Sequence, residues 1–471
     1  MGTFIVGETK VRPGEYHRFE NAGGIQTAGA KNGIIAGVFR SNWGPLNKAV
    51  TLLPSTDVKK VFGSGQSQDM IPIMFEPGNI KGYFVRVGTG GTAGAITLKD
   101  SAVEAVDVVT ITAKYVGNRA FAATIRDSLI NTEKRECIIY DGTSEFEKIT
   151  FDKNPTDGEA AALVAAFATS ENFSATKVAD GNGTLATVTQ SAFTAGTNPT
   201  VDSAAYSAAL ESLEPYTYNV LCVDSTDTAV HALVEAFINR TYAAGSYPMA
   251  VLSEDGTTAL ATRQAHAKAF NNSKICYVLN GGKDVDGNTK EGYINAARIG
   301  GIIAYVPSNK SVTHYVIGKY ADISENLTNT QIESALLSGC IVLTKNAEGN
   351  VWIEQGITTL VSPTDDEDNG WKKIRRVKTR FELMQRIGDT VDKLIGKIDN
   401  DTDGRAAVVA AGQSVIDDMI ATKKLLPGSL IMEDESNPAE GDSAWFVIAV
   451  DDIDSVEKFY LTYRFRFTAK D

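Results

Sequence analysis

The middle of the chain alternates short, continuous apolar runs with stretches in which apolar residues recur at helical spacing. Continuous Val, Ile and Leu runs joined by helices are typical of parallel strands that are covered on both faces. The pattern therefore predicts an α/β domain with a central parallel sheet over 216–364. Its clearest strands are expected at 218–224, 248–253 and 275–280, and its helices at 226–244 and 257–270.

The region between 95 and 215 has a different composition. It is rich in Thr, Ala, Gly and Asp, and period-two runs alternate there with turn residues. Only 159–169 has the spacing of a helix. This combination predicts a peripheral, mostly β outer domain.

An acidic loop at 364–370 marks the next boundary. Beyond it we expect a C-terminal α+β domain with a basic strand at 371–380, a helix to about 395 and a helix from 405 to about 425. A strand follows at 444–450. The expected fold class is thus α/β plus α+β, in several domains with extended terminal arms. The predicted parts are an N-terminal arm (1–20), the first part of the core (21–94), the outer domain (95–215), the α/β domain (216–364), the inner C-terminal domain (365–455) and a C-terminal arm strand (456–471).

The last strand alternates cleanly between apolar and polar positions. Burying five large side chains contributes roughly 8–15 kcal/mol, whereas ordering nine backbone residues costs roughly 9–18 kcal/mol. Such a strand cannot stabilise itself and needs a preformed sheet, either in its own domain or in a neighbouring subunit. One face carries Phe459, Leu461, Tyr463, Phe465 and Phe467, and the other carries Tyr460, Thr462, Arg464 and Arg466.

Composition points away from nucleic acid and from membranes. The 471 residues include 45 Lys or Arg and 58 Asp or Glu, for a formal net charge of −13. Nucleic-acid binding depends on clustered cations, so we expect no nucleic-acid partner. The longest apolar run, 299–306, is far shorter than the ~20 residues of a membrane span, so we expect no membrane insertion. Four scattered cysteines and the lack of a secretory signal suggest synthesis in a reducing cytoplasm.

Two ligand-binding motifs are present only in part. GTGGTA at 88–93 fits the dinucleotide-binding glycine pattern, but a β-prone stretch follows it where a helix is needed, and an inter-domain hairpin explains it better. DNDTDG at 399–404 begins like a calcium-binding loop, but Ala410 stands where the bidentate Glu belongs. An Asx turn in which Asp403 caps the next helix is the simpler interpretation. The four histidines have no metal-ligand or triad spacing, so we expect no catalytic residue, metal or cofactor.

A dense run of positive charge, KKIRRVKTR at 372–380, stands out in this acidic chain. One interpretation is a solvated edge strand on which Lys and Arg discourage aggregation. The other is a positive patch that faces an acidic protein partner. The sequence leaves both open.

Several short segments, in a fixed order, carry a family resemblance. They are 12–16 (RPGEY), 42–45 (NWGP), 83–87 (YFVRV), 296–301 (AARIGG), 306–313 (VPSNKSVT), 339–343 (GCIVL), 353–360 (IEQGITTL), 373–377 (KIRRV) and 395–400 (IGKIDN). Taken together, they resemble the contractile tail sheath proteins of bacteriophages and phage-like particles. The resemblance covers nearly the whole chain and is strongest from about residue 218 onward.

This resemblance implies a structural subunit and not an enzyme. In such sheaths the terminal arms of one subunit complete a β-sheet in the inner domain of another. Stacked hexameric rings thus form a helical tube around an inner tail tube, and contraction drives that tube through the target cell envelope. The implied partners are further copies of the chain, the tube protein, and baseplate and tail terminator proteins, in the tail of a virion or phage-like particle.

The resemblance also assigns residues. The arms would be 2–16, with Phe4, Ile5 and Val6 as its apolar core, and the 459–467 strand. The positive run lies in what should be the inner domain, facing the tube. The candidate tube-facing charges are Lys372, Lys373, Arg375, Arg376, Lys378, Arg380, Lys423 and Lys424.

Two alternatives stay open. The α/β region at 218–345 could bind a small ligand at the carboxyl ends of its strands and act as an enzyme of unknown reaction. Within the structural class, the chain could belong to a secretion-system sheath, although those are usually built from two different chains. An infectious phage, a prophage and an R-type bacteriocin are equally compatible with the sequence.

Overall fold

The computed structural model describes residues 2–3, 16–17 and 32–466. Predicted arm residues that lie outside the described residues are Phe4, Ile5, Val6 and Phe467.

The chain divides into two compact units, which we treat separately. The core unit comprises residues 31–382 and 452–471. The C-terminal unit comprises residues 1–30 and 383–451.

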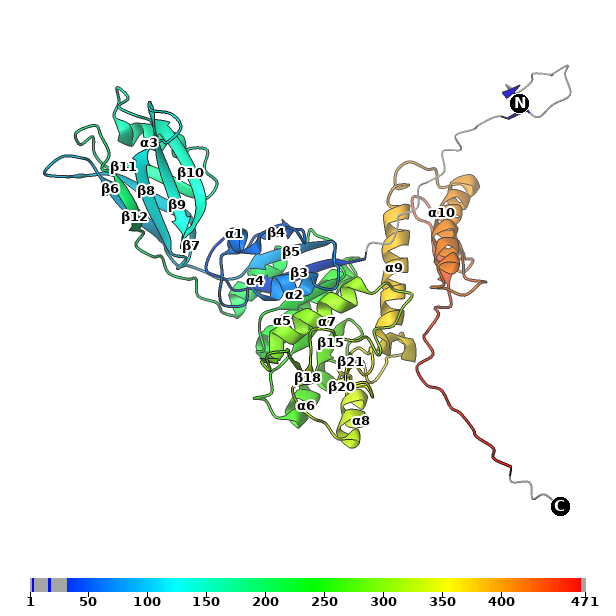
Figure 1. Ribbon diagram of the computed structural model, residues 1–471. Coiled ribbons are helices and arrows are strands. Elements are labelled where there is room, and N and C mark those ends of the chain that lie inside the picture. The colour runs from blue at the N-terminus through cyan, green and yellow to red at the C-terminus, as the bar shows by residue number, and fades with distance from the viewer. Residues whose placement is uncertain (1, 4–15, 18–31, 467–471) are drawn as a thin grey trace. The chain divides into compact units, whose positions relative to one another are not determined.

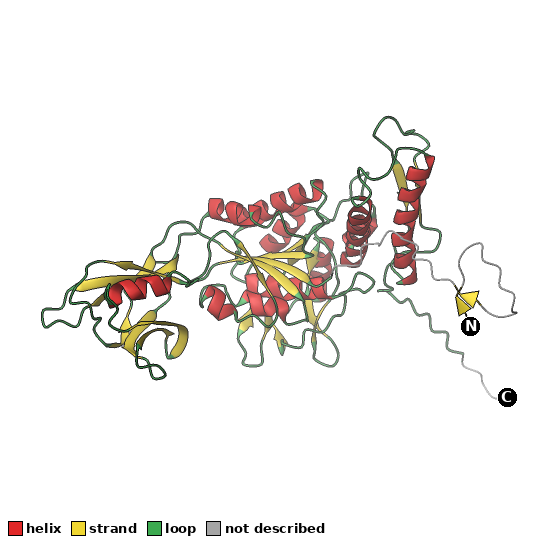
Figure 2. Cartoon of the chain, turned by 90° about the horizontal axis from the view of Figure 1, so that it is seen from above, coloured by secondary structure: helices red, strands yellow, loops and turns green. Residues whose placement is uncertain are grey.

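The core unit is built on a sheet of seven described strands in the order β19-β15-β14-β13-β3-β5-β4. Neighbours run parallel, except that β4 is antiparallel to β5. Every residue of β13, β14 and β15 is buried, because helices lie on both sides of the sheet (Figures 1 and 2). The predicted parallel sheet is present, and it includes strands from the first part of the chain. The strands are β3 (Ile34–Phe39), β4 (Ala49–Leu52), β5 (Lys81–Arg86), β13 (Val220–Val223), β14 (Met249–Ser253), β15 (Ile275–Val278) and β19 (Cys340–Ile341).

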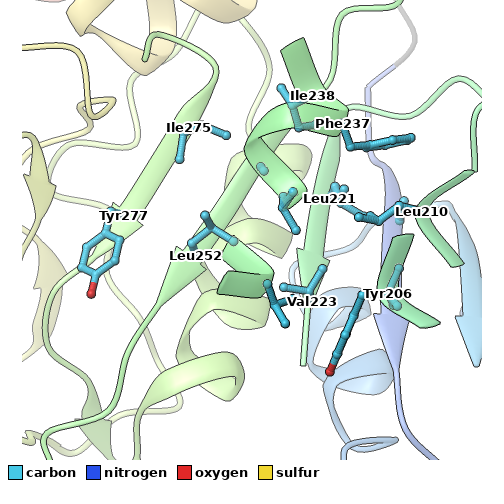
Figure 3. Packing of buried hydrophobic residues seen from close by; sticks show 14 of the residues in the cluster. Tyr206, Leu210, Leu221, Val223, Phe237, Ile238, Leu252, Ile275 and Tyr277 are labelled. Carbon is cyan, nitrogen blue, oxygen red and sulfur yellow. The ribbon is translucent and has the colours of Figure 1, made fainter. Parts of the chain in front are cut away.

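Helices join this sheet through a large apolar core. Side chains of α4 and α5, such as Tyr206 and Phe237, share one cluster with Leu221 and Leu252 of the sheet (Figure 3). Helix α7 is buried along most of its length and contacts β13, β14 and α2. A Cβ at Gly301 would lie 2.7 Å from the Met74 carbonyl oxygen, so glycine permits the close approach of α7 to α2. The helices are α1 (Val58–Phe62), α2 (Met70–Phe75), α4 (Ser203–Glu211), α5 (Thr228–Ala243), α6 (Leu260–Phe270), α7 (Gly292–Tyr305) and α8 (Asn329–Leu337).

His231 of α5 couples the stability of this core to pH. Its side chain is 1% exposed, Nε2 lies 2.9 Å from the Ser225 carbonyl oxygen, and Nδ1 has no partner in the described part of the chain. Burial lowers the pKa of His231 because the charged imidazolium is poorly solvated there. Its contribution to stability is therefore complete above the unfolded pKa of about 6.5 and is lost as the pH falls below that value.

We expect the free energy of unfolding of the wild-type protein to decrease more between pH 7.5 and 5.5 than that of His231→Asn. Over this pH range, which reaches one unit below the unfolded pKa, the difference can be at most about 1.4 kcal/mol. Urea titrations at the two pH values measure it. Equal decreases in the two proteins would contradict the prediction.

The segment between β5 and α4 forms the predicted mostly β region, which we call the outer domain (residues 93–192). Two antiparallel sheets, β10-β9-β8-β12 and β11-β7-β6, enclose an apolar core with α3. Inside it, Arg135 Nη1 lies 2.6 Å from Glu159 Oε2, which also accepts the Leu185 amide at 2.7 Å. Trp43, from the β3–β4 connection, belongs to this core. The elements are β6 (Ala93–Lys99), β7 (Asp107–Val116), β8 (Phe121–Asp127), β9 (Lys134–Asp141), β10 (Ser144–Asp152), α3 (Glu159–Phe167), β11 (Phe173–Lys177) and β12 (Val188–Ala192).

Short strand pairs complete the described chain. No described helix is long and apolar enough to cross a membrane. The short strands are β1 (Gly2–Thr3), β2 (Tyr16–His17), β16 (Gly282–Lys283), β17 (Thr289–Lys290), β18 (Asp322–Ile323), β20 (Leu343–Lys345) and β21 (Val351–Ile353).

The basic strand predicted at 371–380 is wrong. A 3₁₀ helix, η1 (Asn369–Lys372), is followed directly by the long helix α9 (Ile374–Val391). Ile374, Val377 and Phe381 are 1, 0 and 5% exposed, and their spacing is that of one buried helix face. The positive charges therefore lie on a helix and not on a sheet edge.

The C-terminal unit contains the second half of α9, helix α10 (Thr402–Ala421) and the strands β22 (Leu430–Glu433) and β23 (Phe446–Ala449). Its core joins the two helices and β22 through residues such as Leu383, Val415 and Ile431. Asp401, and not Asp403, caps α10, because Asp401 Oδ1 accepts the Gly404 amide at 2.8 Å. The sequence did not predict β22.

Candidate functional site: a C-terminal arm, its anchor and an open sheet edge

The chain ends in a segment whose apolar side chains are uncovered. No helix or strand is assigned to 453–466, and Figure 1 draws this stretch as an extended trace. Phe459, Leu461, Tyr463 and Phe465 are 78, 71, 72 and 93% exposed. These are the residues of the predicted apolar face. No described part of the chain covers that face, as expected of a strand that completes a sheet elsewhere.

The segment before this arm is bound by the positive face of α9. Arg376 Nε and Nη2 donate to the two oxygens of Asp452 at 2.7 and 2.6 Å, and Arg380 donates to the same carboxylate at 3.1 and 3.2 Å. Arg380 also forms two 2.9 Å hydrogen bonds with Asp368. Burial alone would raise the pKa of Asp452, but the hydrogen bonds from the two arginines outweigh it and lower that pKa.

Glu457 makes a second contact five residues later. Lys373 forms an ion pair with its carboxylate, and Gln355 Nε2 donates to it at 3.0 Å. The hydroxyls of Thr313 and Ser311 donate at 2.8 and 3.2 Å. Burial would raise the pKa of Glu457, but these hydrogen bonds and the Lys373 charge lower it. The carboxylate is therefore charged at neutral pH, and protein side chains donate its hydrogen bonds.

A third contact lies between the two carboxylates, where Arg375 Nη1 donates to Ser455 Oγ at 2.7 Å. All three contacts belong to the core unit. The cations are evident in the sequence, but their partners are not, because these lie about 80 residues further along the chain. We define the arm anchor as Asp452, Ser455 and Glu457 together with Lys373, Arg375, Arg376 and Arg380.

The predicted tube-facing cations have different environments. Arg375, Lys378 and Lys424 are 8, 9 and 6% exposed, and Lys372 is half-buried. Lys423 is exposed. The others belong to the arm anchor. Contact with a tube stays a prediction for all of them.

The C-terminal unit presents a two-stranded sheet with an apolar outer face. β22 and β23 are antiparallel, with Ile431 opposite Ile448. Ile431 is 5% exposed and packs in the helix-side core. Because side chains alternate along a strand, the other face belongs to the intervening residues. Those with large exposed side chains are Leu430, Met432, Trp445 and Val447.

The two outer edges of this sheet differ. Gln413 of α10 covers the β22 edge, since its Oε1 accepts the Ile431 amide at 3.2 Å and its Nε2 donates to the Ser429 carbonyl at 3.3 Å. The Ile431 amide thus points away from β23, and the antiparallel register turns the backbone groups of Ile448 away from β22. No described strand pairs with this edge of β23. Among the described residues, this edge of β23 is therefore open.

A groove of about 230 Å³ lies beside β23 in the C-terminal unit. Phe446 of β23 is one wall, and most of the other lining side chains are apolar. An unpaired edge beside an apolar groove suits an added strand that has one apolar face. The apolar lining residues are Val391, Leu394, Ile395, Ile398, Val408, Ala444 and Phe446.

A second cavity, of about 520 Å³, lies at the carboxyl ends of β3 and β13, where the enzyme alternative would place a ligand. Its buried carboxylate, Asp224, accepts Arg40 Nε at 2.8 Å and the Tyr206 hydroxyl at 2.5 Å, and also bonds Ser67. Among the described residues, no group of three or more His, Cys, Asp or Glu is placed to bind a metal ion. The other lining carboxylates, Asp202, Asp227 and Asp255, accept the backbone amides of Ala205, Ala229 and Thr257. All four lining carboxylates thus make structural hydrogen bonds.

The glycine-rich motif at 88–93 connects β5 to the outer domain. Strand β6 follows it, as the sequence predicted, and the motif pairs with the returning chain through the bridges Thr89–Thr200 and Thr92–Thr197. A helix N-terminus that could bind a pyrophosphate does not follow. The motif is an inter-domain connection.

Comparisons with known proteins show which sequences and folds this chain is similar to. Residues 200–359 match the phage tail sheath protein central domain. A curated relative, the uncharacterized protein YqbK of Bacillus subtilis (strain 168), is 21% identical over 406 residues, which are 84% of this chain and 82% of YqbK.

Solved structures extend the similarity to the rest of the fold. The sheath tail protein of Desulfitobacterium hafniense is similar with a TM-score of 0.70 at 20% identity, over 93% of this chain and all of that one. The sheath tail protein of Listeria innocua has a TM-score of 0.68 at 18% identity, over 90 and 96% of the two chains. The contracted helical sheath of the anti-feeding prophage has a TM-score of 0.52 at 10% identity, over 97 and 99%. The resemblance found in the sequence is confirmed: residues 200–359 match the phage tail sheath protein central domain, and the chain has the fold of sheath tail proteins.

Proposed function

We propose that this protein is the structural subunit of a contractile tail sheath. It polymerises as a sixfold helical tube around an inner tail tube, and its contraction drives that tube through the target cell envelope. Its partners are further copies of itself, the tube protein, and baseplate and tail terminator proteins. Its place is the tail of a phage or phage-like particle.

One observation carries the proposal: the chain contains an unsatisfied donor strand and an open acceptor edge. The 459–466 segment exposes its apolar side chains, and the β23 edge lies beside an apolar groove. An arm from one copy that pairs with β23 of another copy would bury both the apolar side chains of the arm and the apolar groove. The predicted N-terminal arm, 2–16, would act in the same way. Many weak links of this kind stabilise a mesh through multivalency.

Contraction in this proposal is a change between two sets of interfaces. The extended sheath is metastable and is restrained by the baseplate and by contacts with the tube. When it is triggered, subunits rotate outward and bury more surface against one another, while the arms keep them connected. Exposed cations such as Lys423 would contact the tube through solvent-screened pairs, which release readily.

Electron microscopy of the purified protein tests the proposal. We expect hollow, striated tubes of uniform diameter in negative stain, formed without the tube protein by the lower-energy contracted arrangement. If a small oligomer forms instead, the protein is mixed with its cognate tube as a template. Failure to coat that tube would contradict the proposed function.

A further inference from the structure

Beyond residue 31 the chain crosses between its two units twice, and these two crossings separate the arm from the acceptor hairpin. Helix α9 leaves the core unit after Glu382, and the chain returns to the core unit at Asp452. The hairpin β22–β23 belongs to the C-terminal unit, whereas the arm belongs to the core unit. Only Val450 and Asp451 lie between β23 and the first residue of the arm anchor.

Without the arm anchor, the arm would simply continue from β23. The anchor prevents this through contacts at three positions of a six-residue span. Its carboxylates are well shielded, because the side chains of Asp452 and Glu457 are 6 and 10% exposed. Shielded, multiply hydrogen-bonded pairs of this kind persist in salt that weakens exposed pairs.

The cations of the anchor are held in place by the core unit itself. Ile374 and Val377 bury the opposite face of α9, so the helix presents its arginines in a fixed direction. Gln355 and Thr313 reach Glu457 from separate segments of the same unit. The anchor is therefore a built site for residues 452–457 and not a chance surface pair.

We infer that the arm anchor attaches the arm to the core unit, so that donor and acceptor of one chain are carried by different units. The arm follows the core unit, and the hairpin follows the C-terminal unit. The consequence for assembly rests on the proposed function: each link would join the core unit of one subunit to the C-terminal unit of the next. Bending between the two units of one subunit would then be transmitted to its neighbours.

The anchor also sets the length of the free arm. With the anchor closed, the free segment begins at Lys458. With the anchor open it begins at Asp452, because Asp451 is held in the C-terminal unit, where its amide donates to Ser429 Oγ at 3.2 Å and its carbonyl accepts the Leu426 amide at 2.8 Å. The six additional residues extend the reach of the arm by roughly 20 Å, at about 3.3 Å per residue. A longer, looser tether lowers the effective concentration of the arm at its acceptor.

A nitroxide spin label on the unassembled protein tests the anchor directly. It is attached at Val456→Cys, between Ser455 and Glu457, because Val456 is 71% exposed and the four native cysteines are buried. In this background we compare the native anchor with the double variant Asp452→Asn/Glu457→Gln, and with the control Asp451→Asn/Asp454→Asn, which removes two exposed carboxylates from the same stretch. We expect the label to move at least about threefold faster in the anchor variant and at an unchanged rate in the control. Unchanged hydrogen exchange at β13–β15 verifies that each protein is folded.

Equal mobility of the label in the anchor variant and the control would overturn the inference. For proteins that form tubes, the same pair is compared by electron microscopy, where we expect the anchor variant to form shorter tubes with a wider spread of diameters. Tubes indistinguishable from those of the control would overturn the role of the anchor in assembly. If the wild type neither forms tubes nor coats its cognate tube, the proposed function fails, while the spin-label experiment still decides whether the arm is anchored to the core unit.

Discussion

Deletion of residues 459–471 is expected to leave a folded monomer that forms no tubes. Residues 459–466 of this segment are not covered by any described part of their own chain, so their loss removes no intramolecular core. In an assembly the same segment would bury several large apolar side chains, each contributing about 1.5–3 kcal/mol. Circular dichroism and thermal unfolding measure the fold, and sedimentation and negative-stain microscopy measure assembly. Tubes of wild-type length from the deleted protein would contradict the arm as donor.

Point variants separate the two faces of the arm. Leu461→Asp/Phe465→Asp places charges on the apolar face, and Tyr460→Asp/Thr462→Asp places the same charges on the other face. Losing two buried apolar side chains removes about 3–6 kcal/mol per link. We therefore expect the first variant to raise the critical concentration at least about 100-fold and the second to raise it far less. Equal increases in the critical concentration for the two variants would indicate that the arm does not bury only its apolar face when it pairs.

The central sheet was predictable because its signals are local. Strands β13, β14 and β15 are continuous apolar runs, so their hydrophobic pattern alone indicates them. The start of α8 is equally local, because Thr328 caps it in a capping box with Gln331, three residues later. Such elements are predictable because one short segment contains the residues that determine their structure.

The positive run shows where such analysis stops. Charge dominated the interpretation of 371–380, although Ile374, Val377 and Phe381 carry the spacing of a helix. The partners of these cations, Asp452 and Glu457, follow some 70 to 80 residues later. No local pattern reveals an ion pair across that separation. The function of the arm was predictable, whereas its anchor required the fold.

The acceptor edge was missed for a related reason. β22 is four residues long and only Ile431 is buried, so its alternation is too short to distinguish from a loop. Gln413 of α10 covers the edge of β22, and no pattern in the sequence around Gln413 indicates this contact. The difference between a covered and an open edge therefore arises from tertiary structure.

The outer domain depends on one residue that comes from outside it. Trp43 is 2% exposed and packs edge-on against Phe121 and Tyr115, with ring centroids 4.9 and 5.1 Å apart. The Arg119 guanidinium lies 5.7 Å from the centroid of the Trp43 ring. Nearby, the fully buried Arg86 of β5 donates to the Gly44 and Val116 carbonyls at 2.8 Å each. Trp43 and Arg86 thus join the central sheet to the outer domain.

Trp43→Ala is expected to destabilise the outer domain by about 3–5 kcal/mol, because it removes a large aromatic side chain from a packed core. Trp445→Ala, at a position 44% exposed, is the matched control, with an expected cost below about 1 kcal/mol. Urea unfolding followed by hydrogen exchange at β7 and β8 measures both. Trp43 contacts neither the arm nor the hairpin. If these two suffice for assembly, the Trp43→Ala protein will still form tubes at temperatures where its outer domain is folded. A variant that remains folded but forms no tubes would show that the outer domain contributes an interface of its own.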